Sequence, residues 1–276
     1  MTDSIRQCLD YAVSQLPGDT AELDAQILLT DILQKPRSHL YAWPDQRLSA
    51  GQAQQFYHAV QQCLAGMPVA YIVGWQEFWS LPLAVNEHTL IPRPETELLV
   101  ETVLQQHRAS DKLNLLDAGT GSGAIALALA SEKPQWQILA SDLSAGALAV
   151  ASGNSQRLQL PVNFVQMNWL EAIAGQSLDV VVSNPPYIAG DDEHLAALQY
   201  EPQSALVAEN DGLAAIDTVC QQSRVALKPG GALYIEHGHD QAAAVCSLFV
   251  ANGFSDVRTL LDYAGCDRLI CGVKHA

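Results

Sequence analysis

The strongest constraint on the fold is the alternation of strand-like and helix-like segments that begins at Leu113. Short runs rich in Val, Ile and Leu are followed by longer segments with helical periodicity, a pattern typical of a parallel sheet covered by helices. The predicted strands are 113–117, 136–141, 162–166, 178–183, 231–236, 256–260 and 267–273, and the predicted helices are 122–132, 144–158, 211–227 and 239–251. We therefore predict an α/β fold class with a doubly wound, mostly parallel seven-stranded sheet. No helix separates the last two strands, so the sheet is expected to end antiparallel.

The segment before this sheet has a different character. Residues 1–75 show helical periodicity only, and Ser49 with Gln52 forms a capping-box pattern at the start of one helix. These residues predict a small N-terminal helical bundle. Residues 76–94 predict a hairpin or extended linker, because their prolines delay the next helix until position 95. The larger domain is then expected over 95–276.

Composition indicates a globular protein of the cytoplasm. Of the 276 residues 49% are hydrophobic, yet no apolar stretch reaches the roughly 18 residues that a membrane span needs. The first residues lack a basic start followed by an apolar core, so no signal peptide is expected. The six cysteines are scattered without a C-x-x-C pair, a distribution that favours reduced thiols over disulfides. We expect no membrane partner.

Charge and metal-binding side chains limit the classes of function. The net charge is −16 and no basic run is present, which weighs against DNA as a partner. The tightest cluster of metal-capable side chains is Glu236, His237 and His239. It lacks further ligands at standard spacing, so we interpret it as a strand-end turn and expect no metal.

A glycine-rich turn follows the first predicted strand of the sheet. Residues 113–124 place glycines at 119, 121 and 123, where the absent Cβ atoms let a ligand approach the backbone. Asp142 ends the next strand and is suited to the two hydroxyls of a ribose. Either a dinucleotide or S-adenosylmethionine (SAM) fits this outline, and a tight turn without ligand remains open. Asp117 favours SAM, since a carboxylate beside the turn would repel a pyrophosphate but attract an ammonium group.

A second motif, Asn184-Pro185-Pro186-Tyr187, follows the apolar run 180–183. Two consecutive prolines have no backbone N–H and fix φ near −65°, so they end the strand and hold the neighbouring carbonyls rigidly. An amide side chain, bare carbonyls and an aromatic ring can together grip a planar –NH2 group. Ligands of open α/β sheets lie at the carboxyl ends of the strands where the strand order reverses. If strands 113–117 and 178–183 flank that point, both motifs face one crevice.

The chain resembles the class I SAM-dependent methyltransferases, whose sheet is Rossmann-like, and among them the group with an (Asn/Asp)-Pro-Pro-(Tyr/Phe/Trp) motif that methylates planar nitrogens. More closely, it resembles the protein-(glutamine-N5) methyltransferases of peptide chain release factors, the PrmC/HemK family. The segments that carry this resemblance are 77–83, 91–97, 117–123 and 183–187, and it extends over essentially the whole chain. It implies that the substrate is the glutamine of the Gly-Gly-Gln loop of class 1 release factors.

The resemblance also implies roles for residues. Catalysis is assigned to Asn184, Pro185 and Tyr187, and substrate binding to these three with Pro186 and Arg93. Cofactor binding is assigned to Asp117, Gly119, Thr120, Gly121, Ser122, Gly123, Asp142, Asn168, Trp169 and Asn184. In one departure, this chain has Asn168-Trp169 where the family often has Asp-Trp, so the side chain near the adenine amino group is uncharged.

Three alternatives stay open at this level. A glutamine of a ribosomal protein is a second possible acceptor, because a sister enzyme shares the same tetrapeptide; the run 93–97 favours release factors. An adenine N6 amine is a third, since it presents the same planar –NH2 group. A nucleotide-binding module without methyl transfer is a reading from another class.

Overall fold

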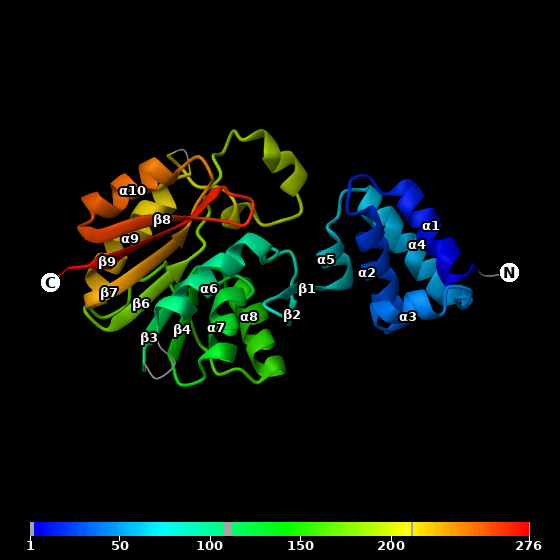
Figure 1. The fold of residues 1–276 in the computed structure, drawn as a ribbon, viewed down its shortest axis with the longest axis horizontal. Coiled ribbons are helices and arrows are strands. Elements are labelled where there is room, and N and C mark those ends of the chain that lie inside the picture. The colour runs from blue at the N-terminus through cyan, green and yellow to red at the C-terminus, as the bar shows by residue number, and fades with distance from the viewer. Residues whose placement is uncertain (1–2, 108–111, 211, 276) are drawn as a thin grey trace. The chain divides into compact units, whose positions relative to one another are not determined.

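The computed structural model describes residues 3–107, 112–210 and 212–275, and its chain divides into two compact units, Met1–Trp75 and Gln76–Ala276 (Figure 1). Each unit has a hydrophobic core of its own.

The N-terminal unit consists mainly of helices joined by short loops. Its helices are α1 (Ile5–Gln15), α2 (Ala21–Leu33), α3 (Arg37–Ala42), α4 (Ala50–Leu64) and α5 (Val69–Val73). Ser4 and Ser49 each close a capping box with the glutamine three residues later, which supplies partners to amides that the helix leaves unpaired. Ile5, Leu28 and Phe56 are fully buried between the helices. The sequence did not predict α3 and α5, because six and five residues show too little periodicity.

A hairpin precedes the main sheet, and its first residue, Trp75, is the last residue of the N-terminal unit. Strands β1 (Trp75–Phe78) and β2 (Leu81–Ala84) pair with each other only. The two residues between them, Trp79 and Ser80, have φ of 53° and 59°, as a tight two-residue hairpin turn requires. The turn is anchored where the Trp79 backbone N–H donates to Glu97, 2.8 Å away.

The main sheet has seven strands in the order β5-β4-β3-β6-β7-β9-β8. The strands are β3 (Asn114–Ala118), β4 (Gln137–Asp142), β5 (Asn163–Gln166), β6 (Leu178–Ser183), β7 (Leu227–Glu236), β8 (Phe254–Leu261) and β9 (Asp267–Lys274). All pair in parallel except β9, which runs antiparallel to both its neighbours. The predicted fold class, including the antiparallel end, is confirmed.

Helices cover both faces of this sheet (Figure 1). They are α6 (Glu97–Gln106), α7 (Ala124–Glu132), α8 (Ala145–Leu158), α9 (Ala214–Ala226) and α10 (Ala242–Ala251). Alternate strand residues enter opposite cores, because side chains of a strand point to opposite faces. On β6, for example, Val180 and Val182 pack in the core with α6 and α7, whereas Val181 packs in the core with α9 and α10.

Most elements start or end one to three residues from their predicted limits, and α9 and β7 illustrate the differences. The helix predicted over 211–227 is the shorter α9, and residue 211 lies outside the described residues. Strand β7 starts four residues before the predicted 231, because the ladder with β6 continues through an irregularity between Leu178 and Val180. Pro229 and the glycines after it obscured that extension in the sequence, since such residues are rare inside strands.

The topology brings the two sequence motifs together. Strands β3 and β6 are neighbours, with Leu116 paired to Val181, and the strand order reverses between them. The glycine-rich turn follows β3 and the Asn-Pro-Pro-Tyr segment follows β6, so both lie at the carboxyl edge of the sheet. This is the expected ligand position in an open α/β sheet. In the part of the chain that the structure describes, no helix combines the length and apolarity of a membrane span.

Candidate active site

The glycine-rich turn keeps the backbone open to a ligand. Gly119 has φ of 77°, and a Cβ built there would lie 2.8 Å from the Trp169 ring. At Gly121, with φ of 57°, a Cβ would have no atom within 4 Å. The first glycine is therefore required for packing against Trp169, while the second leaves free space above the turn.

Asp117 stabilises this turn through buried hydrogen bonds. It is fully buried, and its Oδ2 accepts hydrogen bonds from the Thr120 hydroxyl at 2.6 Å and from the Ala126 amide at 3.2 Å. Its Oδ1 is buried and has no hydrogen-bond partner within the described chain. Desolvation raises the pKa of Asp117 to about 7, against the opposing effect of the Thr120 hydrogen bond. A buried carboxylate oxygen without a hydrogen-bond partner favours a ligand that places a positive charge near the turn.

Asp142 lies at the end of β4, opposite the turn. Its Oδ2 accepts from the Gly121 amide and its Oδ1 from the Ser144 amide, both at 2.9 Å. The two bonds fix the plane of the carboxylate, and each oxygen keeps a lone pair for another donor. This geometry suits the adjacent hydroxyls of a ribose.

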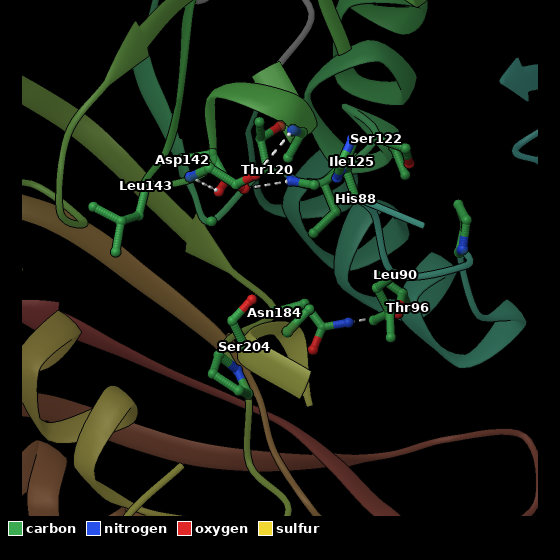
Figure 2. A pocket seen from close by; sticks show the side chains of 18 of the residues that line it. His88, Leu90, Thr96, Thr120, Ser122, Ile125, Asp142, Leu143, Asn184 and Ser204 are labelled. Carbon is green, nitrogen blue, oxygen red and sulfur yellow. Dashed lines mark hydrogen bonds between the residues drawn. The ribbon is translucent and has the colours of Figure 1, made fainter. Parts of the chain in front are cut away.

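A cavity of about 390 Å³ joins these residues to the Asn-Pro-Pro-Tyr segment. Its lining includes Gly119, Thr120, Gly121, Ser122, Asp142, Asn168, Trp169, Asn184, Pro186 and Arg93 among the residues proposed from sequence. Figure 2 shows the labelled Asp142 and Thr120 on one side and Asn184 on another. The remaining four, Asp117, Gly123, Pro185 and Tyr187, are not part of the lining. Asp117 supports the turn from within, and Gly123 is the N-cap of α7.

Several lining residues were missed by sequence reasoning. They are His88, Leu90, Pro92, Thr96, Ala124, Ile125, Leu143, Ser144, Ala147, Ser204 and Ala205. Most of them come from connecting segments, where no periodicity marks the side that faces a ligand. Pro92, Thr96 and Ala124 could have been found, because they lie inside the motif segments 91–97 and 113–124.

Asn184 is held by a chain of side chains that starts at the cavity. Its Nδ2 donates to the Thr96 hydroxyl at 3.1 Å, and that hydroxyl donates to Glu236 Oε2 at 2.7 Å (Figure 2 shows the first bond). The Tyr187 hydroxyl donates to the other oxygen, Glu236 Oε1, at 3.2 Å. Glu236 is only 2% exposed, and this burial raises its pKa to about 7. The sequence around Glu236 predicts only a strand-end turn, whereas the structure shows its contacts with Thr96 and Tyr187.

Arg93, which lines the cavity, pairs with a buried carboxylate. Its guanidinium donates to Glu201, whose side chain is 2% exposed. The second oxygen of Glu201 accepts the Ile91 amide at 3.0 Å. Glu201 precedes Ser204 and Ala205, which line the cavity. The pair thus connects the segment before α6 to the segment that contributes Ser204 and Ala205 to the lining.

The residues present fit SAM. Free space above Gly121 lets a ligand approach the backbone. The buried, unpartnered Oδ1 of Asp117 favours a cationic amine near the turn. The oriented carboxylate of Asp142 suits a ribose. The Trp169 ring and Leu143 offer apolar surface for an adenine. Among described residues no group of three or more metal-capable side chains comes together.

Comparisons with known proteins agree with this geometry. The family model described as "Methyltransferase small domain" matches residues 94–262. A crystal structure of a methyltransferase from Pyrococcus furiosus superposes with a TM-score of 0.56 at 14% identity, covering 78% of this chain and 98% of that chain, which is a likeness of fold. Fold and site together define a class I SAM-dependent methyltransferase, and SAM is its cofactor.

Full-length relatives narrow the assignment. The family model "PrmC N-terminal domain" matches residues 7–74. A release factor glutamine methyltransferase from Shewanella oneidensis is 44% identical over 273 residues, 97% of this chain and 95% of that protein. One from Escherichia coli is 42% identical over 268 residues, 96% of each chain. The chain belongs to the release factor glutamine methyltransferase family.

Proposed function

We propose that this protein transfers a methyl group from SAM to the side-chain amide nitrogen (N5) of the glutamine in the Gly-Gly-Gln motif of class 1 peptide chain release factors. The observation that carries the proposal is the orientation of Asn184 at the cavity. Its Nδ2 is bound to Thr96, so Oδ1 is the atom left for a substrate N–H. The names of the full-length relatives supply the identity of the acceptor.

The chemical difficulty is that an amide nitrogen is a poor nucleophile, because its lone pair is delocalised into the carbonyl. SAM supplies a methyl group activated by its bond to a positively charged sulfur. Asn184 Oδ1 at the cavity and the carbonyl of Pro185, which lies between the lining residues Asn184 and Pro186, are proposed to accept one N–H each of the glutamine amide. These two bonds direct the nitrogen lone pair toward that methyl group. Holding the reactants in line removes much of the entropic barrier.

The same two acceptors act more strongly as the reaction proceeds. The nitrogen gains positive charge as the N–C bond forms and the C–S bond breaks, so its N–H groups become better donors. Stabilisation that grows toward the transition state is what raises the rate. Tyr187 and Pro186 complete the rigid segment that receives the flat amide. The methylated amide cation is strongly acidic and then loses its proton to water, so no general base is required.

The N-terminal unit is proposed as a docking surface for the release factor. Tyr41 and Trp43, on and just after α3, are 63% and 61% exposed, which places two large aromatic side chains close together on the surface of this unit. Exposed aromatic residues are enriched where proteins bind one another. The proposal also places the enzyme in the cytoplasm, with its substrate.

Radiolabelled SAM tests the proposed function and its alternatives in one experiment. The protein is incubated with labelled SAM and a cell extract, and products are separated on a gel before and after nuclease treatment. Label in a protein band of release-factor size, resistant to nuclease, is the expected result. Label that nuclease removes would indicate a nucleic-acid amine, and absence of any label would leave only a binding function.

A further inference from the structure

The hydrogen bonds that link Asn184, Thr96 and Glu236 have a defined donor and acceptor at each step. The Thr96 hydroxyl lies 3.1 Å from Asn184 Nδ2 and 2.7 Å from Glu236 Oε2. Thr96 and Glu236 are 4% and 2% exposed, so solvent does not replace either bond. A hydroxyl has one hydrogen to donate, and an ionised carboxylate can only accept. As long as Glu236 is ionised, the Thr96 hydrogen is therefore donated to Glu236.

This commitment fixes the Asn184 carboxamide. With its hydrogen used, Thr96 offers only lone pairs to Asn184, and only the –NH2 end of the carboxamide can donate to them. A carboxamide turned by 180° would place Oδ1 against those lone pairs and lose the bond. Oδ1 is then held toward the site, where it acts as an acceptor for the substrate.

We propose that Thr96 and Glu236 are positioning residues that set the orientation of the Asn184 carboxamide and thereby select its acceptor end for the substrate –NH2 group. This inference rests on the proposed function, because it assumes that the substrate presents N–H groups. Both residues act through Asn184, and neither is assigned a contact with the reacting atoms. Tyr187 donates to the same carboxylate, so one buried acid aligns both ends of the Asn-Pro-Pro-Tyr segment.

The protonation state of Glu236 should then control turnover. The charged or titratable groups that face it are Tyr187 from the segment after β6, Arg268 from β9 and Glu95 before α6. Desolvation outweighs the opposing effects of Thr96, Arg268 and Tyr187 and raises the pKa of Glu236 to about 7. Once protonated, Glu236 can donate to Thr96, whose freed hydrogen can bond Asn184 Oδ1. The wrong amide orientation becomes permitted, and kcat falls as pH falls through about 7.

Substitutions at Thr96 separate this role from simple packing. Thr96→Val keeps the shape and removes the hydroxyl, whereas Thr96→Ser restores the hydroxyl. Thr102→Val is the matched control, because Thr102 is also 4% exposed and lies on α6 outside the network. The measurements are kcat on a whole release factor at saturating SAM, the Kd for SAM, and kcat from about pH 6 to pH 9, a range that brackets a carboxyl pKa raised by burial.

The expected results are specific to each variant. Thr96→Val should lower kcat by about 10- to 100-fold with little change in the Kd for SAM, while Thr96→Ser stays within about threefold of wild type, as expected for loss and retention of one orienting hydrogen bond. Thr102→Val should match wild type. Glu236→Gln should lose the acid limb of the kcat profile. A Thr96→Val enzyme with wild-type kcat, a Thr96→Ser enzyme as impaired as Thr96→Val, or an unchanged acid limb in Glu236→Gln would each overturn the proposal.

A readout without turnover keeps this inference distinct from the proposed function. The side-chain ¹H–¹⁵N resonances of Asn184 report whether its –NH2 group donates a buried hydrogen bond. Slow proton exchange in wild type above pH 7, lost in Thr96→Val and retained in Thr96→Ser, supports the orientation even if the release factor is not the acceptor. Fast exchange in wild type would overturn it. Failure of wild type to methylate the release factor would instead reject the proposed function.

Discussion

Replacing Asn184 with alanine should separate catalysis from cofactor binding. The carboxamide contributes one of two acceptors for the substrate amide, and it makes no hydrogen bond to the glycine-rich turn among those of the described chain. Loss of one pre-organised polar group of this kind costs about 10²- to 10³-fold in kcat, or about 3–4 kcal/mol. The Pro185 carbonyl remains, so the loss should not exceed that range. The Thr96 hydroxyl keeps its bond to Glu236, which limits the stability loss to about 1 kcal/mol.

The assay is transfer of labelled methyl groups to a purified release factor at saturating SAM, together with calorimetric titration of SAM into the variant. We expect kcat to fall by about 10²- to 10³-fold and the Kd for SAM to change less than about twofold. Asn168→Ala provides the converse, because Asn168 lines the cavity beside Trp169. It should weaken SAM binding and leave kcat at saturation nearly intact. Loss of SAM affinity in Asn184→Ala in parallel with activity would refute the reasoning.

Four further predictions follow from other contacts. Asp117→Asn neutralises the buried carboxylate that is proposed to attract the ammonium group of SAM, directly or through water, and should raise the Kd for SAM by at least about tenfold, as measured by titration, since interactions with a charged group contribute about 1.5–3 kcal/mol. Glu236→Gln should gain about 3 kcal/mol of unfolding free energy relative to wild type as pH rises from 4.5 to 7. The reason is that Glu236 of the wild type is ionised in the unfolded state but protonated in the folded state across that range, so the wild type loses stability as pH rises. A difference in unfolding free energy between the two proteins that stays constant with pH, measured by denaturant titration, would contradict this. Arg93→Gln leaves the buried Glu201 without its ion-pair partner and should destabilise the protein by about 3 kcal/mol. Adding Glu201→Gln should recover part of this loss. If the changes in unfolding free energy of the two single variants simply add up in the double variant, the two side chains are not coupled. Trp43→Ala should raise KM for a whole release factor but not for a Gly-Gly-Gln peptide, whereas Val225→Ala, also an exposed apolar residue, should alter neither.

The fold could be predicted because its pattern is local. Strand β6 is buried on both faces, so Val180, Val181 and Val182 form a continuous apolar run, and the glycine-rich turn follows β3 directly. We expected β3 and β6 to be adjacent, because ligand sites in such sheets lie where the strand order reverses. Their parallel pairing confirms this expectation.

The arrangement of the site was harder to predict from the sequence, because it depends on contacts between side chains that are far apart in the chain. Thr96 reaches Asn184 across 88 positions and Glu236 across 140. No spacing rule links such residues, and their contact arises only from the register of β6 against β7 and the placement of the segment before α6. A threonine in a proline-rich linker and a glutamate at a strand end carry no individual signal. Tyr187 was expected against the substrate amide from sequence, and that role stays a prediction beside its bond to Glu236.

The central claim is tested most directly by mass spectrometry of a purified release factor after incubation with this protein and SAM. The account predicts a mass increase of one methyl-for-hydrogen exchange on the peptide that contains Gly-Gly-Gln, with fragmentation placing it on the glutamine side chain. It also predicts that a release factor with that glutamine replaced gains no mass. An unmodified glutamine in the wild-type release factor, or a methyl group on any other residue, would contradict it.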